Sequence, residues 1–321
     1  MATKGARSSN AGVVVSLSAN CLEVIGLGLT AWFTRSTAIK AQTAANAAEV
    51  AVTVFLLIGV LSSVRGPDDT HPLGYGRDRF FWSLFAALGL FVGGGGLALD
   101  EALQSALHPA PVHEFVLAYL VLGATAAMDA GAMLVGLRPL REQAAIRGIS
   151  SRAYLRISTD PAAVTVVVGG GCAVIGAFVA ATGLVISQLT HSPVPDTVAS
   201  ALIGLLLLSA SVLLLRTNRE LLTGRGVGPA LLGEMRKVIA QQPGVHEVTD
   251  LFAVVVGPLS LVVDGDVTFE HGLDVSAVEQ AITNAAAEMR QRWPMIQYIY
   301  LTPVAAKRPR GAPRKAESAP R

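Results

Sequence analysis

Two sets of polar residues lie within apolar stretches near the N-terminus, and their spacing points to ion chemistry. Asn20 and Glu23 follow Ser16 at intervals of four and three residues, which places all three on one face of a helix. Asn46 and Glu49 repeat the same spacing in the next apolar stretch. If the two faces meet, they form a polar seam of two carboxylates and two amides. Their oxygens can ligate a divalent ion, and the glutamates can carry protons.

These acidic groups are candidates for function because of where they stand. An ionisable side chain inside a membrane span costs about 2.5–3.5 kcal/mol to insert, so Glu23 and Glu49 need a reason to be there. Asp129 is a third carboxylate within an apolar stretch, whereas Asp100 and Glu101 stand near the end of theirs, where we expect water. A structural alternative stays open: the asparagines hydrogen-bond between helices, and a glutamate is held protonated.

The chain that must position these residues has the composition of a membrane protein. Of its 321 residues 52% are hydrophobic and 15% are charged, with a mean hydropathy of +0.52. Soluble domains carry about 25% charged residues. Lys and Arg are concentrated after the second and fourth apolar stretches, which predicts that both termini lie in the cytosol. The apolar stretches predict six spans, near residues 12–33, 39–61, 81–104, 114–137, 162–187 and 196–216.

After Arg216 the pattern changes to that of a small soluble domain. A helix is followed by strands at 246–256 and 259–269, with Asp264-Gly265 as a bulge or turn, then by a helix at 274–292 and a strand at 296–301. The predicted fold class is therefore an all-α six-helix transmembrane domain plus a small α+β (α-β-β-α-β) cytosolic C-terminal domain. The predicted parts are a cytosolic tail at 1–11, the transmembrane domain at 12–216, the C-terminal domain at 228–304 and a disordered basic tail at 305–321.

Charge and cysteine content argue against a nucleic-acid-binding protein and against a disulfide-stabilised fold. The net charge is +2, but residues 305–321 alone carry +5, so the remainder is near −3 and does not predict a nucleic-acid surface. Cys21 and Cys172 both lie in apolar stretches, so no disulfide framework is expected. The sequence shows no nucleophile–base pair and no cofactor motif. We therefore expect neither an enzyme nor a cofactor, and a divalent metal ion enters only as a substrate.

Residues 70–82 form a polar joint between the second and third predicted spans. Pro72, Gly74 and Gly76 interrupt the helix, and the charged residues around them keep the joint in water. Phe80, Phe81 and Trp82 follow where an aromatic belt would meet the lipid headgroups.

The order of residues in this joint resembles a known family. His71-Pro72-Leu73-Gly74-Tyr75-Gly76-Arg77, followed by Phe80-Phe81-Trp82, is similar to the hinge of the cation diffusion facilitators, and most similar to their zinc-transporter-9-like branch. The resemblance covers roughly residues 13–304. It implies a metal-ion/proton antiporter in the lipid bilayer, with a cytosolic metallochaperone-like domain that forms a homodimer. Further matching motifs are Thr159-Asp160-Pro161, Asp196 with Ser200 and Gly204, Glu220-Leu221-Leu222 with Gly224, Pro243-Gly244-Val245 and Gly257-Pro258.

The resemblance also implies where each matched residue acts. His71, Pro72, Gly74, Arg77, Asp160 and Pro161 are interpreted as structural motif residues, with Asp160 starting a helix. The family's ligand positions in span two align with Ala45 and Glu49, and those in span five align with Gly169 and Gly170. Three of these four residues cannot coordinate a metal, whereas a tetrahedral site needs about four ligands.

Two functional hypotheses follow from this mismatch. In the first, the protein exports a zinc-like divalent ion in exchange for protons, through a path moved to Asn20, Glu23, Asn46, Glu49 and Asp129. We expect this transporter in the plasma membrane of a bacterium. In the second, it is a transport-inactive paralogue that serves as a regulatory or heterodimer partner subunit.

Overall fold

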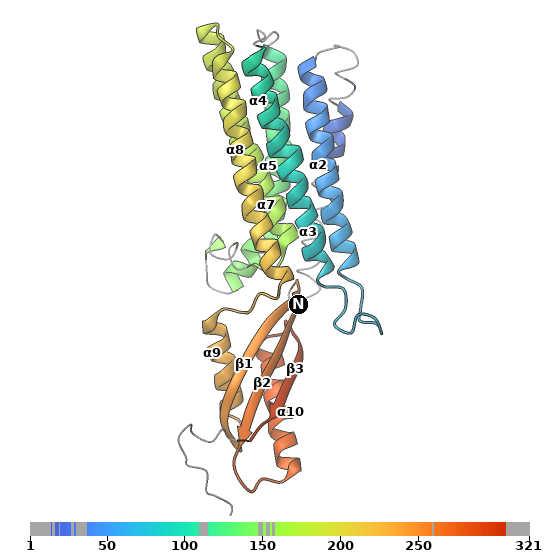
Figure 1. Cartoon of the computed structure of the whole chain (residues 1–321), viewed down its shortest axis with the longest axis vertical. Coiled ribbons are helices and arrows are strands. Elements are labelled where there is room, and N and C mark those ends of the chain that lie inside the picture. The colour runs from blue at the N-terminus through green and yellow to red at the C-terminus, as the bar shows by residue number, and fades with distance from the viewer. Residues whose placement is uncertain are drawn as a thin grey trace, which may run out of the picture. The chain divides into compact units, whose positions relative to one another are not determined.

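The computed structural model describes residues 14, 17–18, 20–26, 29, 37–108, 115–146, 150–151, 155, 158–258 and 260–305. Contacts divide the chain into two compact units: Met1–Arg225 with Val256–Leu259, and Gly226–Val255 with Ser260–Arg321. The first unit is helical and the second contains the sheet (Figure 1).

The first unit is built from long helices that run side by side (Figure 1). The 30 residues from Asp78 to Leu107 form one continuous helical run, of which the middle is π-helical. The elements are α2 (Thr37–Ser62), α3 (Asp78–Gly89), η1 (Leu90–Gly96), α4 (Leu97–Leu107), α5 (Phe115–Ile146), α7 (Pro161–Thr190) and α8 (Val194–Leu222).

Three helical runs among the described residues are long and apolar enough to cross a membrane: Asp78–Leu107, Pro161–Thr190 and Val194–Leu222. A shorter apolar helical segment covers Glu49–Ser62. Residues 20–26 are helical, but most of the first predicted span lies outside the described residues. The total of six spans therefore stays a prediction.

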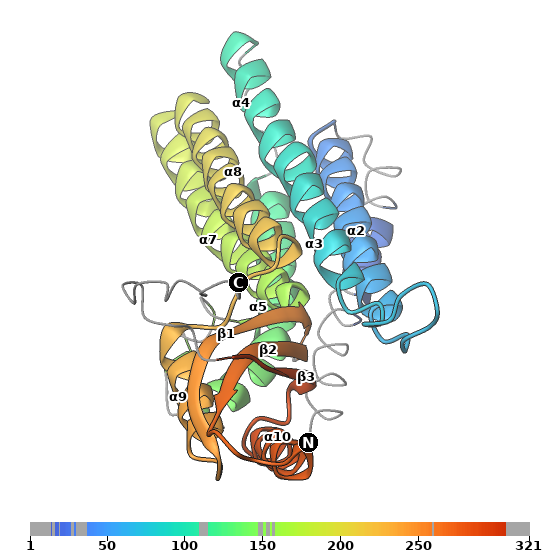
Figure 2. The same cartoon turned by 60° about the horizontal axis from the view of Figure 1, so that its bottom comes forward.

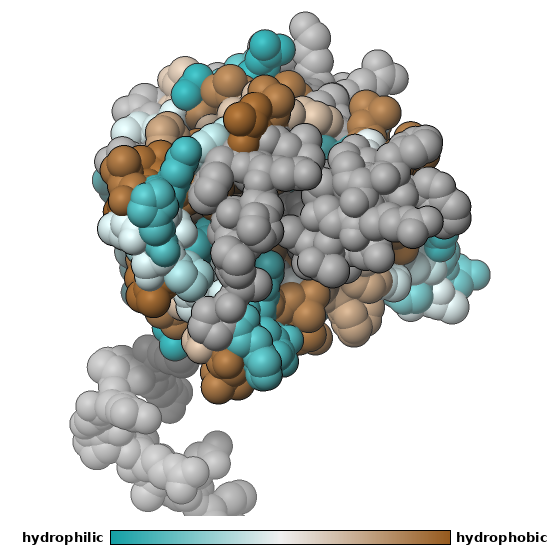
Figure 3. Space-filling view, turned by 90° about the horizontal axis from the view of Figure 1, so that it is seen from above, coloured by the Kyte–Doolittle hydropathy of each residue, from teal (hydrophilic) through white to brown (hydrophobic). Residues whose placement is uncertain are grey.

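The outer surface of the bundle is apolar, as expected for helices in contact with lipid. Seen from one end, hydrophobic residues lie at several places around its rim (Figure 3). Phe178 is 73% exposed and Leu189 is 76% exposed, both on α7. Soluble monomers rarely present contiguous apolar surface on this scale. A bilayer accounts for it.

Packing inside the bundle relies on small residues as well as aliphatic ones. A Cβ atom on Gly95 of η1 would lie 2.6 Å from Leu208 of α8, so this glycine lets the two helices approach closely. Two clusters join the helices: Leu56, Val60, Ala86, Ala162 and Val166 link α2, α3 and α7, and Ala87, Leu90, Val164 and Leu214 link α3, η1, α7 and α8.

The polar joint is placed differently from the prediction. Helix α3 already begins at Asp78, so the non-helical hinge is residues 63–77. The assignment of Phe80 to an aromatic belt is wrong, because this ring is fully buried. Phe80 shares the core-facing side of α3 with Ser83 and Ala87, at helical intervals of three and seven residues. Phe81 is 44% exposed.

The second unit has the order α-β-β-α-β, which confirms that part of the predicted fold. Its sheet has the strand order β1-β2-β3, with β2 and β3 parallel, and both helices lie on one face of it (Figure 2). The elements are α9 (Pro229–Ala240), β1 (Val245–Gly257), β2 (Ser260–Phe269), α10 (Val275–Arg292) and β3 (Ile296–Pro303).

The core of this unit lies between the sheet and the helices, where Met235 of α9, Val263 of β2 and Met289 of α10 are all fully buried. The expected bulge or turn at Asp264-Gly265 is wrong. Both residues pair in register with β3, and the irregularity falls at Leu261/Val262 instead. Gly265 instead leaves room for the Leu251 side chain, because a Cβ at residue 265 would lie 2.8 Å from it.

Candidate functional site

The helical residues 20–26 contact α2 through a hydrogen bond between Asn20 and Thr53. The Thr53 hydroxyl donates to the backbone oxygen of Glu49 at 3.0 Å, one helical turn earlier. Its oxygen therefore accepts from Asn20, whose Nδ2 lies 3.1 Å away. This assignment fixes the Asn20 amide, so its carbonyl oxygen is the atom left for a cation. The polar faces of the first two stretches thus meet at this point.

Three carboxylates gather near this contact. Glu23 is 6% exposed, and Glu49 and Asp129 are half-buried. The charge of Asp129, on α5, interacts with those of both Glu23 and Glu49, and the charges of the two glutamates interact with each other. Three separate parts of the chain therefore contribute one acidic group each. The sequence placed all three residues in one predicted ion path, and a role for that path stays a prediction.

For the remaining residues of the predicted path, the structure describes the backbone but not every side chain. Asn46 and Ala45 lie in α2, but their side chains are outside the described part of the structure. No group of three His, Cys, Asp or Glu side chains among the described residues is close enough to hold a metal ion as they stand. Asp100 and Glu101 are exposed on α4.

Gly169 and Gly170, which the resemblance predicts to be ligand positions, face different surroundings on α7. A Cβ on Gly169 would meet nothing within 4 Å. A Cβ on Gly170 would lie 2.8 Å from Met133 Cβ and 3.2 Å from the backbone oxygen of Asp129. Gly170 therefore brings α7 against α5 at the residue that carries the third carboxylate, while Gly169 leaves space.

The hinge, residues 63–77, is organised by Asp68, which sequence reasoning treated only as a solvated charge. One carboxylate oxygen accepts from the Thr70 hydroxyl and amide and from the His71 amide, at 2.7–2.9 Å, and the other accepts from the Tyr75 hydroxyl at 2.8 Å. Hydrogen bonds from the Thr70 and Tyr75 side chains, then from the His71 backbone, hold the pKa of Asp68 well below its ordinary value. The Asp-x-Thr spacing, typical of a side-chain-bonded turn, was the available signal.

The other motif residues of the hinge are placed at its turns. Gly74 has a φ of 74°, a left-handed conformation that glycine adopts without strain. The His71 ring lies 4.1 Å from that of Tyr75, centroid to centroid, and Arg77 is exposed just before α3. Pro72 lies in the same turn. These positions give the motif a structural role in shaping the connection between α2 and α3.

Asp160 and Pro161 start α7, and Asp160 also forms an ion pair that the sequence did not predict. Its Oδ1 accepts from the amide of Ala163 at 3.3 Å, which caps the helix, and Pro161 occupies the first turn. Nη2 of Arg79, on α3, lies 2.9 Å from Oδ1 and 3.0 Å from Oδ2 of Asp160. Nothing local signals this pair, because its members are 81 residues apart.

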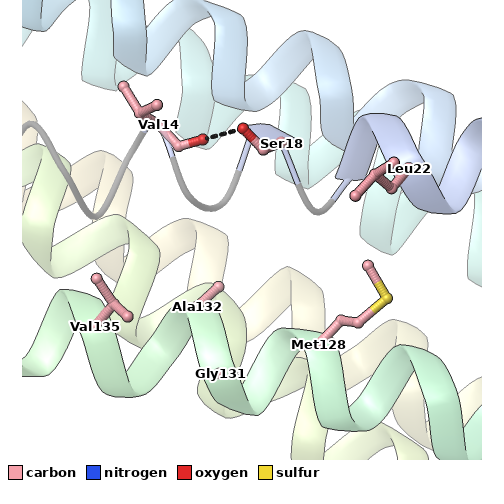
Figure 4. A pocket seen from close by; sticks show the side chains of 7 residues that line it. All are labelled: Val14, Ser18, Leu22, Met128, Gly131, Ala132 and Val135. Carbon is pink, nitrogen blue, oxygen red and sulfur yellow. Dashed lines mark hydrogen bonds between the residues drawn. The ribbon is translucent and has the colours of Figure 1, made fainter.

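An open apolar pocket of about 470 Å³ lies between α5 and the side chains of Val14, Ser18 and Leu22 (Figure 4). The one hydroxyl in its lining, that of Ser18, donates to the backbone oxygen of Val14 at 2.9 Å. Such a surface offers no charged ligand to an ion. The lining residues are Val14, Ser18, Leu22, Met128, Gly131, Ala132 and Val135.

Apolar helices with acidic side chains inside the bundle, together with a small α+β unit, are the features of an ion-carrying membrane protein. Residues 13–223 match the cation efflux transmembrane domain. The chain belongs to the cation efflux family, which confirms the resemblance to the cation diffusion facilitators.

Curated relatives come from plants and animals. The chain is 31% identical over 262 residues to metal tolerance protein C4 of Arabidopsis thaliana, covering 81% of this chain and 57% of the relative. It is 28% identical over 287 residues to the mitochondrial proton-coupled zinc antiporter SLC30A9 of Homo sapiens, covering 89% of this chain and 49% of the relative. The chain thus spans about half the length of the curated relatives it matches. These names describe transporters rather than enzymes, and they give no support to a bacterial plasma membrane.

Proposed function

We propose that this chain is a membrane transporter that exports a zinc-like divalent metal ion in exchange for protons. The observation that carries this proposal is the cluster of Glu23, Glu49 and Asp129, whose charges interact within the helix bundle. Family membership supports the same class of substrate, as do relatives named for metal tolerance and for proton-coupled zinc antiport.

The carboxylate cluster can bind either a divalent metal ion or protons, because both neutralise the same negative charges. Carboxylates left ionised together in a low-dielectric interior repel each other, so a bound cation is favoured. A divalent metal ion can take oxygen ligands from Glu49, Glu23 and the carbonyl of Asn20. When the metal leaves, protons on the same carboxylates restore the balance of charge. Competition between metal and protons for one cluster is the basis of exchange.

The ligand set proposed here differs from the positions that align with the family's site. Gly169 and Gly170 have no side chain to offer, and Glu49 alone of the aligned residues can ligate. Asn20, Glu23 and Asp129 would take the vacated roles after a small inward movement of their helices. We place Asn46 in the same path because of its spacing from Glu49.

The wider arrangement belongs to the same proposal. Six helices span the bilayer, and both termini and the hinge lie in the cytosol, where positively charged loops are retained. Two copies associate through the unit formed by Gly226–Val255 and Ser260–Arg321. The glycines at the aligned positions favour one rival reading, a transport-inactive partner subunit.

A flux assay separates the two readings. The purified full chain is reconstituted in liposomes, and internal Zn²⁺ and pH are recorded by fluorescent indicators while a pH gradient is imposed. We expect Zn²⁺ and protons to move in opposite directions, and Glu49→Gln to lower the rate at least about tenfold. The matched control is Asp100→Asn, which removes an exposed carboxylate and should leave the rate unchanged. Wild-type liposomes without Zn²⁺-dependent proton movement would instead support the partner-subunit reading.

A further inference from the structure

A second buried polar cluster lies at the hinge end of the bundle, away from the carboxylates. It consists of Arg79 and Ser83 on α3, Asp160 at the start of α7, and Asn218 near the end of α8. Arg79 is 2% exposed, and Ser83 and Asn218 are each 1% exposed. We call these four residues the polar layer.

The polar layer joins α3 to two of its neighbouring helices, α7 and α8. The ion pair of Arg79 with Asp160 joins α3 to α7, with both carboxylate oxygens within 3.0 Å of Nη2. The Asn218 amide joins α8 to α3, because its Nδ2 donates to the backbone oxygen of Ser83 at 3.1 Å. Both of these contacts cross a helix–helix boundary.

Two polar atoms of the layer lack hydrogen-bond partners in the part of the chain that the structure describes. The Ser83 hydroxyl oxygen and Asn218 Oδ1 are buried and have no hydrogen-bond partner among the described residues. A buried polar atom without a partner destabilises the packed state, and contact with water removes that penalty. Separation of the helices at this level is therefore less unfavourable than separation at an apolar level.

Next to the polar layer, the same three helices meet in an apolar cluster, where separation is more unfavourable. There, Ala87, Val164 and Leu214 from the same three helices pack into an apolar cluster. Opening that cluster exposes hydrocarbon, which is unfavourable in water. A buried ion pair, in contrast, contributes little net stability compared with apolar side chains of the same size. The polar layer is thus the level at which α3, α7 and α8 can part most readily.

We propose that the polar layer is a latch that closes the hinge end of the ion path and separates in each transport cycle. This inference rests on the proposed transport function, because a latch has a role only in a protein that alternates between open and closed states. Arg79 and Asp160 act as positioning residues: they hold three helix ends together in one state and release them in the other. Water that enters on opening solvates Ser83 and Asn218.

Thiol labelling tests the latch directly. Ser83→Cys places a small reactive group inside the layer of the full chain in liposomes, and a membrane-impermeant thiol reagent is added at fixed pH, with Zn²⁺ or with Mg²⁺. The parent chain, which keeps Cys21 and Cys172, gives the background rate. Thr223→Cys, at an exposed position beyond α8, reports any direct effect of Zn²⁺ on a thiol.

The latch predicts that Zn²⁺ changes the labelling rate of Ser83→Cys at least about tenfold, with no such change at Thr223→Cys. A rate that stays within twofold in liposomes that transport Zn²⁺ would overturn the latch while leaving the transport proposal intact.

A second variant keeps the test informative if no Zn²⁺ moves at all. Arg79→Met with Asp160→Asn removes both charges, and asparagine preserves the helix cap. At fixed pH without Zn²⁺, this pair should raise labelling of Ser83→Cys at least about tenfold, with Cys172 labelling and the thermal midpoint unchanged. Unchanged labelling of Ser83→Cys, or equal increases at Cys172 from general unfolding, would contradict the latch.

Discussion

Substitution of one glycine on α7 should disturb the bundle, while substitution of its neighbour should not. Gly170→Ala places a carbon 2.8 Å from Met133 Cβ and 3.2 Å from the backbone oxygen of Asp129, both shorter than the 3.4 Å at which ordinary contact begins. Gly169→Ala places its carbon where nothing lies within 4 Å. Both changes make the same chemical replacement on the same helix, one residue apart, so the second is a matched control for the first.

The expected magnitude follows from two opposing effects. Alanine is favoured over glycine in a helix by about 1 kcal/mol. An added methyl group in a well-packed core costs about 1–3 kcal/mol. Gly169→Ala should therefore stabilise by up to about 1 kcal/mol, and Gly170→Ala should be neutral or destabilise by up to about 2 kcal/mol. The helix preference cancels in the comparison, so the difference of about 1–3 kcal/mol reports the contact with α5 alone.

Thermal unfolding of the two variants in detergent, followed by circular dichroism at one scan rate, measures this difference. At about 2–4 °C per kcal/mol for a unit of this size, Gly170→Ala should unfold roughly 2–12 °C below Gly169→Ala. Because the contact involves the backbone of Asp129, Gly170→Ala should also slow Zn²⁺ transport more than its control does. Equal midpoints for the two variants, or a higher midpoint for Gly170→Ala, would refute the close approach of α5 and α7.

Two other predictions concern the hinge and the second unit. Asp68→Ala removes the acceptor of four hydrogen bonds, so hydrogen-exchange protection of the amides of residues 70 and 71 should fall severalfold, while Asp69→Ala should leave it unchanged. Because the native pKa of Asp68 lies below its unfolded value, this protection is complete above about pH 4. It should be lost only as the pH falls through the native pKa, so a loss already between pH 7 and pH 5 would contradict the assignment. In the second unit, Met289→Ala should reduce the free energy of unfolding by about 2–5 kcal/mol, and Val275→Ala, at a side chain 83% exposed, by less than about 0.5 kcal/mol in denaturant titrations.

Regular patterns in the sequence predicted the regular parts of the fold. Patterns of apolar and polar residues located the strands and the second helix of the C-terminal unit, and that helix begins after its cap Asp274, at the predicted position. Long apolar runs located α7 and α8, because each contains an extended window of high hydropathy with few charged residues. Both signals act over short distances along the chain.

Features that depend on distant contacts were beyond the reach of sequence patterns. The ion pair of Arg79 with Asp160 joins residues that only tertiary packing brings together. Phe80 was misplaced because an aromatic residue beside a polar joint fits either a lipid interface or a core. Its position on the face of α3 decides between them, and that face is set by the neighbouring helices.

The most direct measurement of the central claim is the release of protons when Zn²⁺ binds to the purified full chain. Titration calorimetry in buffers of different ionisation enthalpy gives both the affinity and the net number of protons released. If Glu23, Glu49 and Asp129 hold either the metal ion or protons, binding should release protons, and Glu49→Gln should lower both the affinity and the release. Unchanged affinity and proton release in Glu49→Gln would contradict a shared carboxylate site.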